Sequence, residues 1–431
     1  MLGWVTPAAP QVVLKAGDTE VALSGYLRIR DTGEFNFDLE DAADADEAVT
    51  FYDVRSYVSV AVRRKPFGGL LSLDLAGDEF NDGVVLGNED PAFVREIELK
   101  IRHLWVEYDG VVHARLGRLP GQAGHAIVSH IIRDAFRVWK DAGPVTANFS
   151  LIKGGESLAV APGSRKPRAL NPPGGDDDDL DAVHFFLELE LDPESKGRLE
   201  FLRHFDSSPD DRFPEKQYLD LNAGGKVGRI SYAAEVAYMF GRTPAAGGRH
   251  LDHRAYLVYL DGAYRWGILA PGFRFGLGSG DDNPADDRQE NFQNLFMDET
   301  GFRYTNIFAD DIHGFDGTGA SLANGAGFAN VTFFQPRLGA RPLPALSLAA
   351  SLTFLLATVD RVEGSGPLGD RPATGSGLTR QVGQEVDLNA TYRLDRYGSL
   401  FLFLGWFTPG RVYGEAADDA FKAEVGIEVR F

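Results

Sequence analysis

The chain has 431 residues, a formal net charge of −20 and no cysteine. The lack of cysteine excludes disulfides, thiolate nucleophiles and cysteine metal sites, and the acidic balance disfavours a general nucleic-acid binder, which needs clustered Lys and Arg. No run approaches the roughly 18 uninterrupted apolar residues of a membrane helix. A membrane-spanning form would therefore have to be a closed β-barrel, the other way to satisfy every backbone group in lipid.

The first residues, MLGWVTPAAPQVVLKAG, lack the charged region and the long apolar run of a secretory signal. We interpret the sequence as a mature chain, or as one whose signal has been removed. Residues 1–19 are then expected to form an N-terminal periplasmic segment. A protein that was never exported is the alternative.

About eighteen short segments alternate apolar and polar residues with the period of two that a β-strand requires. They are residues 20–30, 50–63, 69–77, 95–108, 111–119, 133–140, 145–153, 181–191, 197–205, 216–223, 228–241, 250–260, 263–276, 326–338, 346–359, 385–394, 399–407 and 420–431. The pattern predicts an all-β fold, and eighteen lies within the even-numbered range of bacterial outer-membrane barrels.

The connections between these segments alternate between short and long. The short ones carry turn sequences such as Asp109-Gly110 and Asp261-Gly262, which suit tight hairpins. This rhythm predicts an antiparallel up-and-down transmembrane barrel over residues 20–431, with short periplasmic turns and long extracellular loops. The longest connection, residues 278–325, is rich in aromatic residues, so we expect part of it to pack over or into the barrel mouth.

The last segment, AFKAEVGIEVRF, has one apolar and one charged face. Phe421, Val425 and Phe431 lie on the apolar face, and Lys422 and Glu424 lie on the other. An apolar face toward lipid and a polar face toward a watery lumen are typical of the closing strand of an outer-membrane barrel. A soluble β-sandwich strand can alternate in the same way, but a sandwich gives no reason for short and long loops to alternate.

If the apolar faces contact lipid, the polar faces line the lumen and carry rows of arginine between carboxylates. The basic residues at these inward positions are Arg28, Arg30, Arg55, Lys100, Arg102, Arg115, Arg137 and Arg393. One interpretation is a structural ladder of ion pairs across neighbouring strands. The other is an anion path, because arginine in a confined pore raises the local concentration of anions. The alternation slips at residues 103–105, which predicts a β-bulge.

Two acidic loop segments, Asp176–Asp181 and Asp281–Asp287, offer oxygen ligands for Ca²⁺, but neither has the spacing of an EF-hand loop. We expect solvated acidic loops and no cofactor. Catalytic motifs such as Gly-x-Ser-x-Gly are absent from the sequence. Residues 121–130 place Ser129 beside His130, which is the basis of a hydrolase hypothesis, but spacing indicates no acidic partner. The sequence thus predicts a protein that is not an enzyme.

Three segments resemble the alginate-export family of outer-membrane proteins. They are ARLGRLPGQAGHAIVSHIIRDAFRVWKDAG (residues 114–143), GFANVTFFQPRLGARPLPALSLAASLTF (327–354) and GQEVDLNATYRLDRYGSLFLFLGWFTPG (383–410). The resemblance covers most of the chain in order and length. It implies an 18-stranded monomeric barrel whose arginine-rich lumen passes an anionic polysaccharide outward. The chain departs from the family pattern after Gly117-Arg118, so the resemblance does not predict the third outer loop.

The sequence therefore predicts a passive channel in the bacterial outer membrane that passes anionic polysaccharide or other anionic solutes. A general porin, or a plugged barrel that serves as a scaffold or binding partner in an outer-membrane complex, is the alternative. The expected partners are membrane lipid and lipopolysaccharide, the transported anions and, as an open alternative, a periplasmic protein. No nucleic-acid partner is expected.

Overall fold

The computed structural model describes residues 12–37, 39, 48–76, 100–156, 179–206, 215–245, 249–283, 286–294, 302–313, 327–367 and 377–431. Within these residues the chain forms twenty strands in one sheet. They are β1 Val12–Ala16, β2 Thr19–Phe35, β3 Ala48–Arg64, β4 Phe67–Ala76, β5 Lys100–Asp109, β6 His113–Ala123, β7 Ser129–Ala142, β8 Val145–Glu156, β9 Asp179–Asp192, β10 Ser195–Asp206, β11 Glu215–Val227, β12 Ile230–Ala245, β13 Arg249–Tyr264, β14 Leu269–Gly278, β15 Arg288–Gln289, β16 Val331–Leu343, β17 Leu346–Val362, β18 Leu378–Arg393, β19 Gly398–Pro409 and β20 Ala420–Arg430. A π-helical turn, Phe308–Ile312, and a short 3-10 helix, Arg411–Tyr413, complete the regular structure of the described residues.

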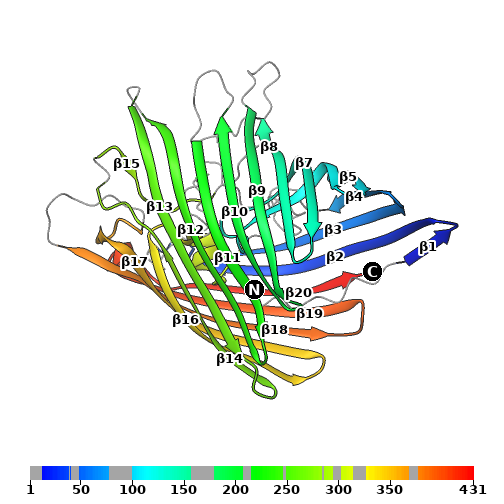
Figure 1. Cartoon of the computed structure of the whole chain (residues 1–431). Helices are drawn as coiled ribbons and strands as arrows, with labels where there is room; N and C mark the ends of the chain where they lie inside the picture. Colours follow the sequence, from blue (N-terminus) through cyan, green and yellow to red (C-terminus); the bar gives the residue numbers. More distant parts are fainter. Residues whose placement is uncertain are drawn as a thin grey trace, which may run out of the picture.

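The sheet closes on itself because the last strand pairs with the second. Among the described residues, eighteen strands, β2–β14 and β16–β20, form an antiparallel barrel in which β20 lies beside β2 (Figure 1). The seam is completed at the chain end, where Gly25 N donates to Phe431 O at 2.7 Å and Phe431 N donates to Gly25 O at 3.0 Å. The prediction of an all-β, up-and-down barrel of about eighteen strands is confirmed.

The two faces of the wall differ as strand alternation requires. Outward side chains are apolar and exposed, for example Leu221 at 61%, Val236 at 52% and Val425 at 53%. Inward neighbours such as Ala237 and Met239 are fully buried. Apolar side chains exposed all around a closed sheet are a lipid-facing surface. The described part of the chain contains no helix long and apolar enough to cross a membrane.

The two rims of the barrel differ in their connections, as the sequence predicts. At one rim, here called the short-turn rim, successive strands are joined by residues 65–66, 110–112, 143–144, 193–194, 228–229, 265–268, 344–345 and 394–397. The opposite rim, the long-loop rim, carries connections that reach from residue 279 to 330, but also the short connections 124–128 and 246–248. Both the start of β2 and the end of β20 lie at the short-turn rim, as expected for an even strand number.

Two details of the strand prediction are resolved by the hydrogen-bond register. The predicted turn at Asp261-Gly262 is wrong, because β13 continues to Tyr264 and Gly262 pairs with Phe273 in β14. Asp261 faces the lumen instead, where Arg274 and Arg337 contact its carboxylate. The predicted bulge is confirmed: Ser72 pairs with His103 but Leu73 pairs with Ile101, so Arg102 is the extra residue.

Two short strands, β1 and β15, are not among the eighteen strands that form the barrel. β1 is exposed and pairs antiparallel with the first residues of β2, from Thr19 to Leu23, so it extends the β2 hairpin beyond the short-turn rim. The predicted periplasmic segment 1–19 includes this strand, and its first eleven residues lie outside the described part of the chain. β15 pairs in parallel with β13 at Asp252 and His253.

Gly117 in β6 is expected to be essential for barrel stability. Its φ of +132° is strained for any L side chain, and a Cβ there would collide with the carbonyl oxygen of Leu104 in β5. We expect Gly117→Ala to lower barrel stability by about 2 kcal/mol or more, measured as a lower unfolding temperature in heat-modifiable gel migration. Gly33→Ala is the matched control, since Gly33 lies in β2 and an added Cβ would meet no atom within 4 Å. Equal unfolding temperatures for the two variants would contradict this expectation.

Candidate functional site

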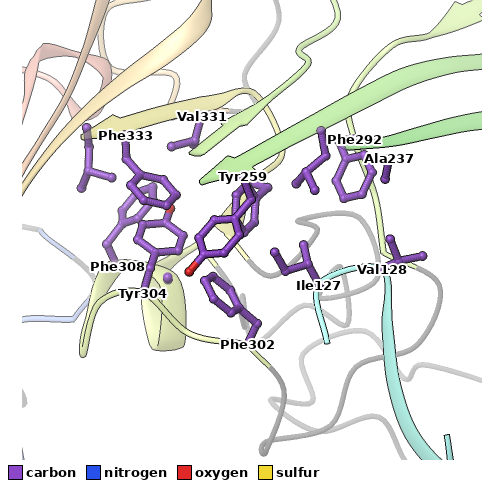
Figure 2. Packing of buried hydrophobic residues seen from close by; sticks show 14 of the residues in the cluster. Ile127, Val128, Ala237, Tyr259, Phe292, Phe302, Tyr304, Phe308, Val331 and Phe333 are labelled. Carbon is purple, nitrogen blue, oxygen red and sulfur yellow. The ribbon is translucent and has the colours of Figure 1, made fainter. Parts of the chain in front are cut away.

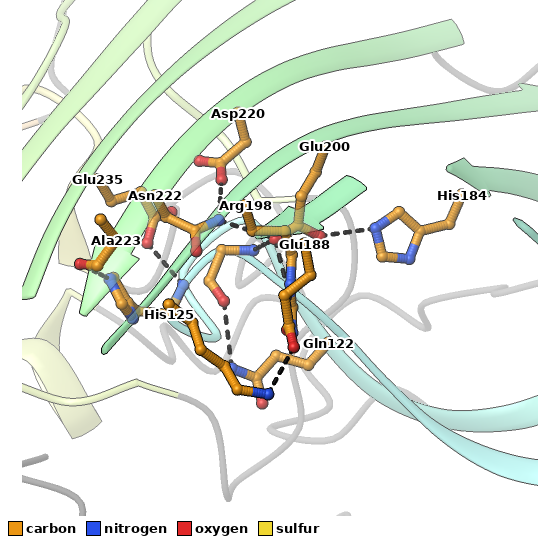
Figure 3. Close-up of polar contacts among 12 residues, drawn as sticks. Gln122, His125, His184, Glu188, Arg198, Glu200, Asp220, Asn222, Ala223 and Glu235 are labelled. Carbon is orange, nitrogen blue, oxygen red and sulfur yellow. Dashed lines mark hydrogen bonds and ion pairs between the residues drawn. The ribbon is translucent and has the colours of Figure 1, made fainter. Parts of the chain in front are cut away.

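The connection between β6 and β7, residues 124–128, folds into the barrel lumen. Its backbone is held by carboxylates on the wall: Gly124 N donates to Glu200 Oε1 at 3.1 Å, and His125 N donates to Glu235 Oε2 at 2.6 Å (Figure 3). Gly124 has φ +62°, and a Cβ at this position would collide with the Glu235 carboxylate. Glycine therefore lets the backbone approach the acidic wall closely. Since β6 and β7 extend to this tip, most of the sequence expected to form an outer loop is strand.

Behind this connection lies a network of buried polar groups on β9–β12. His184 Nε2 lies 2.7 Å from Glu200 Oε2, and Asn222 Nδ2 donates to Glu200 Oε1 at 2.8 Å (Figure 3). Asn222 also bonds to Asp220. Glu200, Asp220 and Glu235 are each about 1% exposed. Buried carboxylates need such donors, because an unpaired charge in this environment is strongly destabilising.

His125 completes the docking of the connection. Its Nε2 atom lies 3.2 Å from the carbonyl oxygens of both Ala223 and Ala234. Burial lowers the pKa of this imidazole, which favours the neutral ring. A neutral ring with its proton on Nε2 donates to these carbonyls, so the side chain and the backbone of His125 anchor the connection together.

A second segment, residues 302–313 of the long connection between β14 and β16, also lies inside the barrel. Ile307 N and Phe308 N donate to the two oxygens of Glu385 at 2.7 and 2.8 Å, and Asn306 N donates to Asp387 Oδ1 at 3.2 Å. The π-helical turn follows directly. Glu385 and Asp387 lie on β18 and are 0% and 2% exposed.

Aromatic side chains join this segment to the wall. Tyr304 stacks on Phe333 with ring centroids 3.8 Å apart, and Phe302 meets Tyr259 edge to face at 4.9 Å (Figure 2). Tyr304 also donates its hydroxyl to Gly327 O at 2.7 Å. Aromatic clusters of this kind are large contributors to packing energy. These contacts pack residues 302–313 against the inner wall of the barrel.

The two inward segments meet in the lumen. Phe302 N donates to Ala126 O at 3.3 Å, and Ile127 and Val128 belong to the same buried apolar cluster as Phe302 (Figure 2). We call residues 124–128 and 302–313 together the constriction. Its backbone donors are held by four buried wall carboxylates, which we call the acidic latch: Glu200, Glu235, Glu385 and Asp387.

Most of the predicted lumen arginines lie on one side of the barrel, in β2, β3, β5, β6 and β7. Arg28 pairs across the strands with Arg55, and Arg115 pairs with Arg137, so each pair sets two guanidinium-bearing residues directly opposite each other. Arg115 also lies over the Trp105 ring, 4.2 Å from its centroid. Arg137 Nε donates to the neutral Ser150 Oγ at 3.3 Å.

Three predicted arginines have carboxylate partners on the same or a neighbouring strand. Arg30 Nη1 lies 3.1 Å from Glu424 Oε1, Arg102 Nη1 lies 3.4 Å from Asp74 Oδ1, and Arg115 contacts Glu107. These contacts are the ladder of ion pairs that the sequence offers as one interpretation. The opposed arginine pairs are the arrangement that the anion-path interpretation requires. This wall therefore contains both ion pairs and opposed arginines.

Of the two remaining predicted site residues, one lies elsewhere and the side chain of the other is not described. Arg393 is the last residue of β18, where it is exposed at the short-turn rim, away from the constriction. Lys100 begins β5 opposite Asp74, and its side chain lies outside the described residues. The acidic latch is absent from the predicted set, because alternation places its members inside without indicating that they bind loop backbone.

The proposed catalytic pair is not assembled. Ser129 and His130 are consecutive in β7, so their side chains leave opposite faces of the strand. In the acidic connection after β14, ligand oxygens of Asp281, Asp282 and Glu290 lie within 4.8 Å of one another. Burial first, and neighbouring carboxylates in addition, raise the pKa of Asp281 and Glu290. Calcium at this place stays a prediction. Of the other acidic segment, residues 176–178 lie outside the described residues and residues 179–181 begin β9.

A closed barrel with a lipid-facing exterior, a polar interior and a constriction built from inward-folded connections defines the class of outer-membrane channels. Residues 206–426, just over half of the chain, match the alginate export family, and the chain belongs to this family of bacterial outer-membrane proteins. The short-turn rim is accordingly periplasmic and the long-loop rim extracellular. No curated protein sequence matches the chain significantly.

Solved porin structures share the fold. OccK8 (OprE) of Pseudomonas aeruginosa superposes with a TM-score of 0.59 at 11% identity, covering 95% of this chain and 98% of its own. OpdK of the same organism gives 0.57 at 12% identity, with coverage of 95% and 98%. OccAB4 of Acinetobacter baumannii gives 0.56 at 9% identity, also with coverage of 95% and 98%. At such identities the likeness concerns the fold.

Proposed function

We propose that this channel passes anionic solutes, carboxylated saccharides among them, along the wall formed by β2, β3, β5, β6 and β7. The proposal rests on a comparison of how far the basic and the acidic side chains of the lumen are exposed to water. On this wall the side chains of Arg30, Arg102 and Arg115 are 18%, 13% and 24% exposed. The acidic latch, which lies on β10, β12 and β18, is at most 2% exposed.

The constriction accounts for this difference. Its backbone N–H groups cover the latch carboxylates, so these four groups are shielded while Arg30, Arg102 and Arg115 stay partly accessible to water. A pore lined by accessible guanidinium groups concentrates anions and repels cations. The net charge of −20 is then a property of the whole chain, dominated by loops, and a poor guide to the charge that a permeating ion meets.

The cross-strand arginine pairs support the same path. Two positive side chains directly opposite each other in a sheet repel, and a negative group close to both relieves that repulsion. An anion that passes between Arg115 and Arg137, or between Arg28 and Arg55, meets two guanidinium-bearing side chains at once. Several weak sites of this kind let an anion enter and still leave.

The family name and one structural neighbour point to carboxylates as the transported class. Alginate is a polyuronate, and a structure of OpdK has been determined with vanillate, itself a carboxylate. A small carboxylate needs only the open arginine wall. We propose that passage of a polymer also requires residues 302–313 to leave the lumen, since the buried aromatic cluster around Tyr304 and Phe333 otherwise narrows it.

Block of single-channel current by short oligouronates tests the proposal. We expect them to interrupt the ion current of the wild-type channel at lower concentrations than neutral oligosaccharides of the same length. In an Arg115→Ala/Arg137→Ala variant the blocking concentration should rise about tenfold, as expected for the loss of roughly 1–2 kcal/mol of attraction. Arg380→Ala, which removes an exposed arginine of β18 outside this wall, should leave block unchanged. Equal block by neutral and charged oligomers would refute the proposal.

A further inference from the structure

The outer surface of β10–β13 changes in character, row by row, toward the extracellular rim. Residues paired across the four strands lie at one level, and successive outward rows are about 7 Å apart. From the membrane centre outward, the rows are Leu199, Leu221, Val236 and Val258; then Phe201, Leu219, Tyr238 and Tyr256; then Arg203, Gln217, Phe240 and Arg254; and finally Glu215, Arg242 and Asp252. The surface therefore passes from aliphatic to aromatic to charged.

The aromatic row marks a boundary. In outer-membrane barrels, girdles of aromatic residues lie where the hydrocarbon region meets the polar headgroups. Tyr238 and Tyr256, each 45% exposed, occupy this level. The arginine rows directly above them are therefore at the height of the lipid headgroups in the outer leaflet.

A groove of about 410 Å³ crosses these upper rows on the outside of the barrel. Of its lining residues, Tyr238 lies at the aromatic level, Phe240 and Arg254 lie one row above it, and Arg242, Asp252 and Glu215 lie in the last row. An apolar floor below a charged edge suits a ligand that has both a hydrocarbon portion and a charged head. We call this feature the rim groove.

The arginines of the rim groove are only loosely engaged by carboxylates. Arg242 Nε and Arg254 Nη2 share the single carboxylate of Asp252, at 3.7 and 3.9 Å, and Arg203 Nη2 lies 4.0 Å from Glu215. All three distances exceed the range of a direct hydrogen bond. Arg203 lies beside the groove, whose lining holds two arginines, Arg242 and Arg254, and two carboxylates, Asp252 and Glu215. Because Arg242 and Arg254 share Asp252 at distances beyond hydrogen-bond range, their guanidinium groups can still engage a phosphate.

We propose that the rim groove binds a phosphorylated glycolipid of the outer leaflet, with Arg242 and Arg254 contacting a phosphate and Tyr238 and Phe240 lying against the acylated sugar. Arginine forms paired N–H···O bonds to phosphate, and basic pockets at a membrane surface select anionic headgroups. The ligand chemistry is that of lipopolysaccharide. Because the groove is on the lipid side of the wall, a soluble anion passing through the lumen would not meet it.

Native mass spectrometry of the full chain in detergent tests the proposal, with diphosphoryl lipid A as the probe and the same lipid without its phosphates as the comparison. We expect wild-type protein to bind the phosphorylated lipid at least about tenfold more tightly, as for the loss of charge-assisted hydrogen bonds. Arg242→Ala/Arg254→Ala should abolish that preference. Arg380→Ala, an exposed rim arginine on β18 that contacts Asp360, is the matched control and should keep it.

A second variant tests the proposal without relying on a loss of binding, which misfolding could also cause. Asp252→Asn removes the carboxylate that competes for both arginines, so it should tighten binding of diphosphoryl lipid A about threefold. Unchanged binding in the double arginine variant, or equal affinity for the two lipids, would overturn the proposal. Both rim variants should conduct ions like wild type, so failure here is distinguishable from failure of the proposed anion channel.

Discussion

Replacing Glu385 by alanine is expected to raise single-channel conductance several-fold. Glu385 accepts the backbone N–H groups of Ile307 and Phe308 inside the barrel, so this one carboxylate holds both donors. Loss of two such bonds, at ~1.5–3 kcal/mol each, would lower the docked population of residues 302–313 by about 100-fold or more. The segment should then leave the lumen for much of the time and widen the path. Planar-bilayer recording measures the change directly.

Glu188→Ala is the matched control for this prediction. Glu188 also faces the lumen, but its ion pairs are with Lys196 and Arg198 on β10, away from residues 302–313. We expect its conductance to stay close to wild type. If Glu385→Ala and Glu188→Ala conduct alike, residues 302–313 do not limit the current, and the plugged-barrel alternative loses its main support.

Removing one cross-strand arginine pair is expected to weaken anion selectivity about tenfold. A unit charge at ~4 Å contributes about 1 kcal/mol in water-like surroundings, so losing both Arg28 and Arg55 removes roughly 1–2 kcal/mol of preference for an anion. The variant is Arg28→Ala/Arg55→Ala. The measurement is the ratio of anion to cation permeability, obtained from the reversal potential across a salt gradient.

Arg28→Lys/Arg55→Lys separates charge from shape. Lysine keeps both positive charges at these positions but loses the planar fork of the guanidinium group. We expect it to retain most of the wild-type permeability ratio. A lysine variant as unselective as the alanine variant would show that these side chains act by holding the wall together rather than by their charge.

The barrel itself could be predicted from the sequence because its determinants are local. Alternation of apolar and polar residues specifies which face meets lipid, and it identifies each of the eighteen barrel strands of the described structure. The phase slip near His103 correctly indicates the bulge at Arg102. The prediction of a turn at Asp261-Gly262 is wrong because a turn-forming pair also fits a strand when its aspartate has arginine partners in the lumen.

The constriction could not be predicted because its contacts are long-range. Gly124 and His125 meet Glu200 and Glu235, 76 and 110 residues away in sequence, and no local pattern connects them. Alternation could place Glu385 on the inner face but could not show that it would bind loop backbone. The same limit applies to Arg393: strand phase makes it inward, whereas only the strand length places it at the rim.

The reversal potential of the wild-type channel in a potassium chloride gradient tests the central claim most directly. The claim is that the inward segments shield the carboxylates of the acidic latch and leave arginines of β2, β5 and β6 in contact with water. A potential displaced toward the chloride equilibrium value is predicted. A potential displaced toward the potassium value would mean that carboxylates govern the path, and the account would be contradicted.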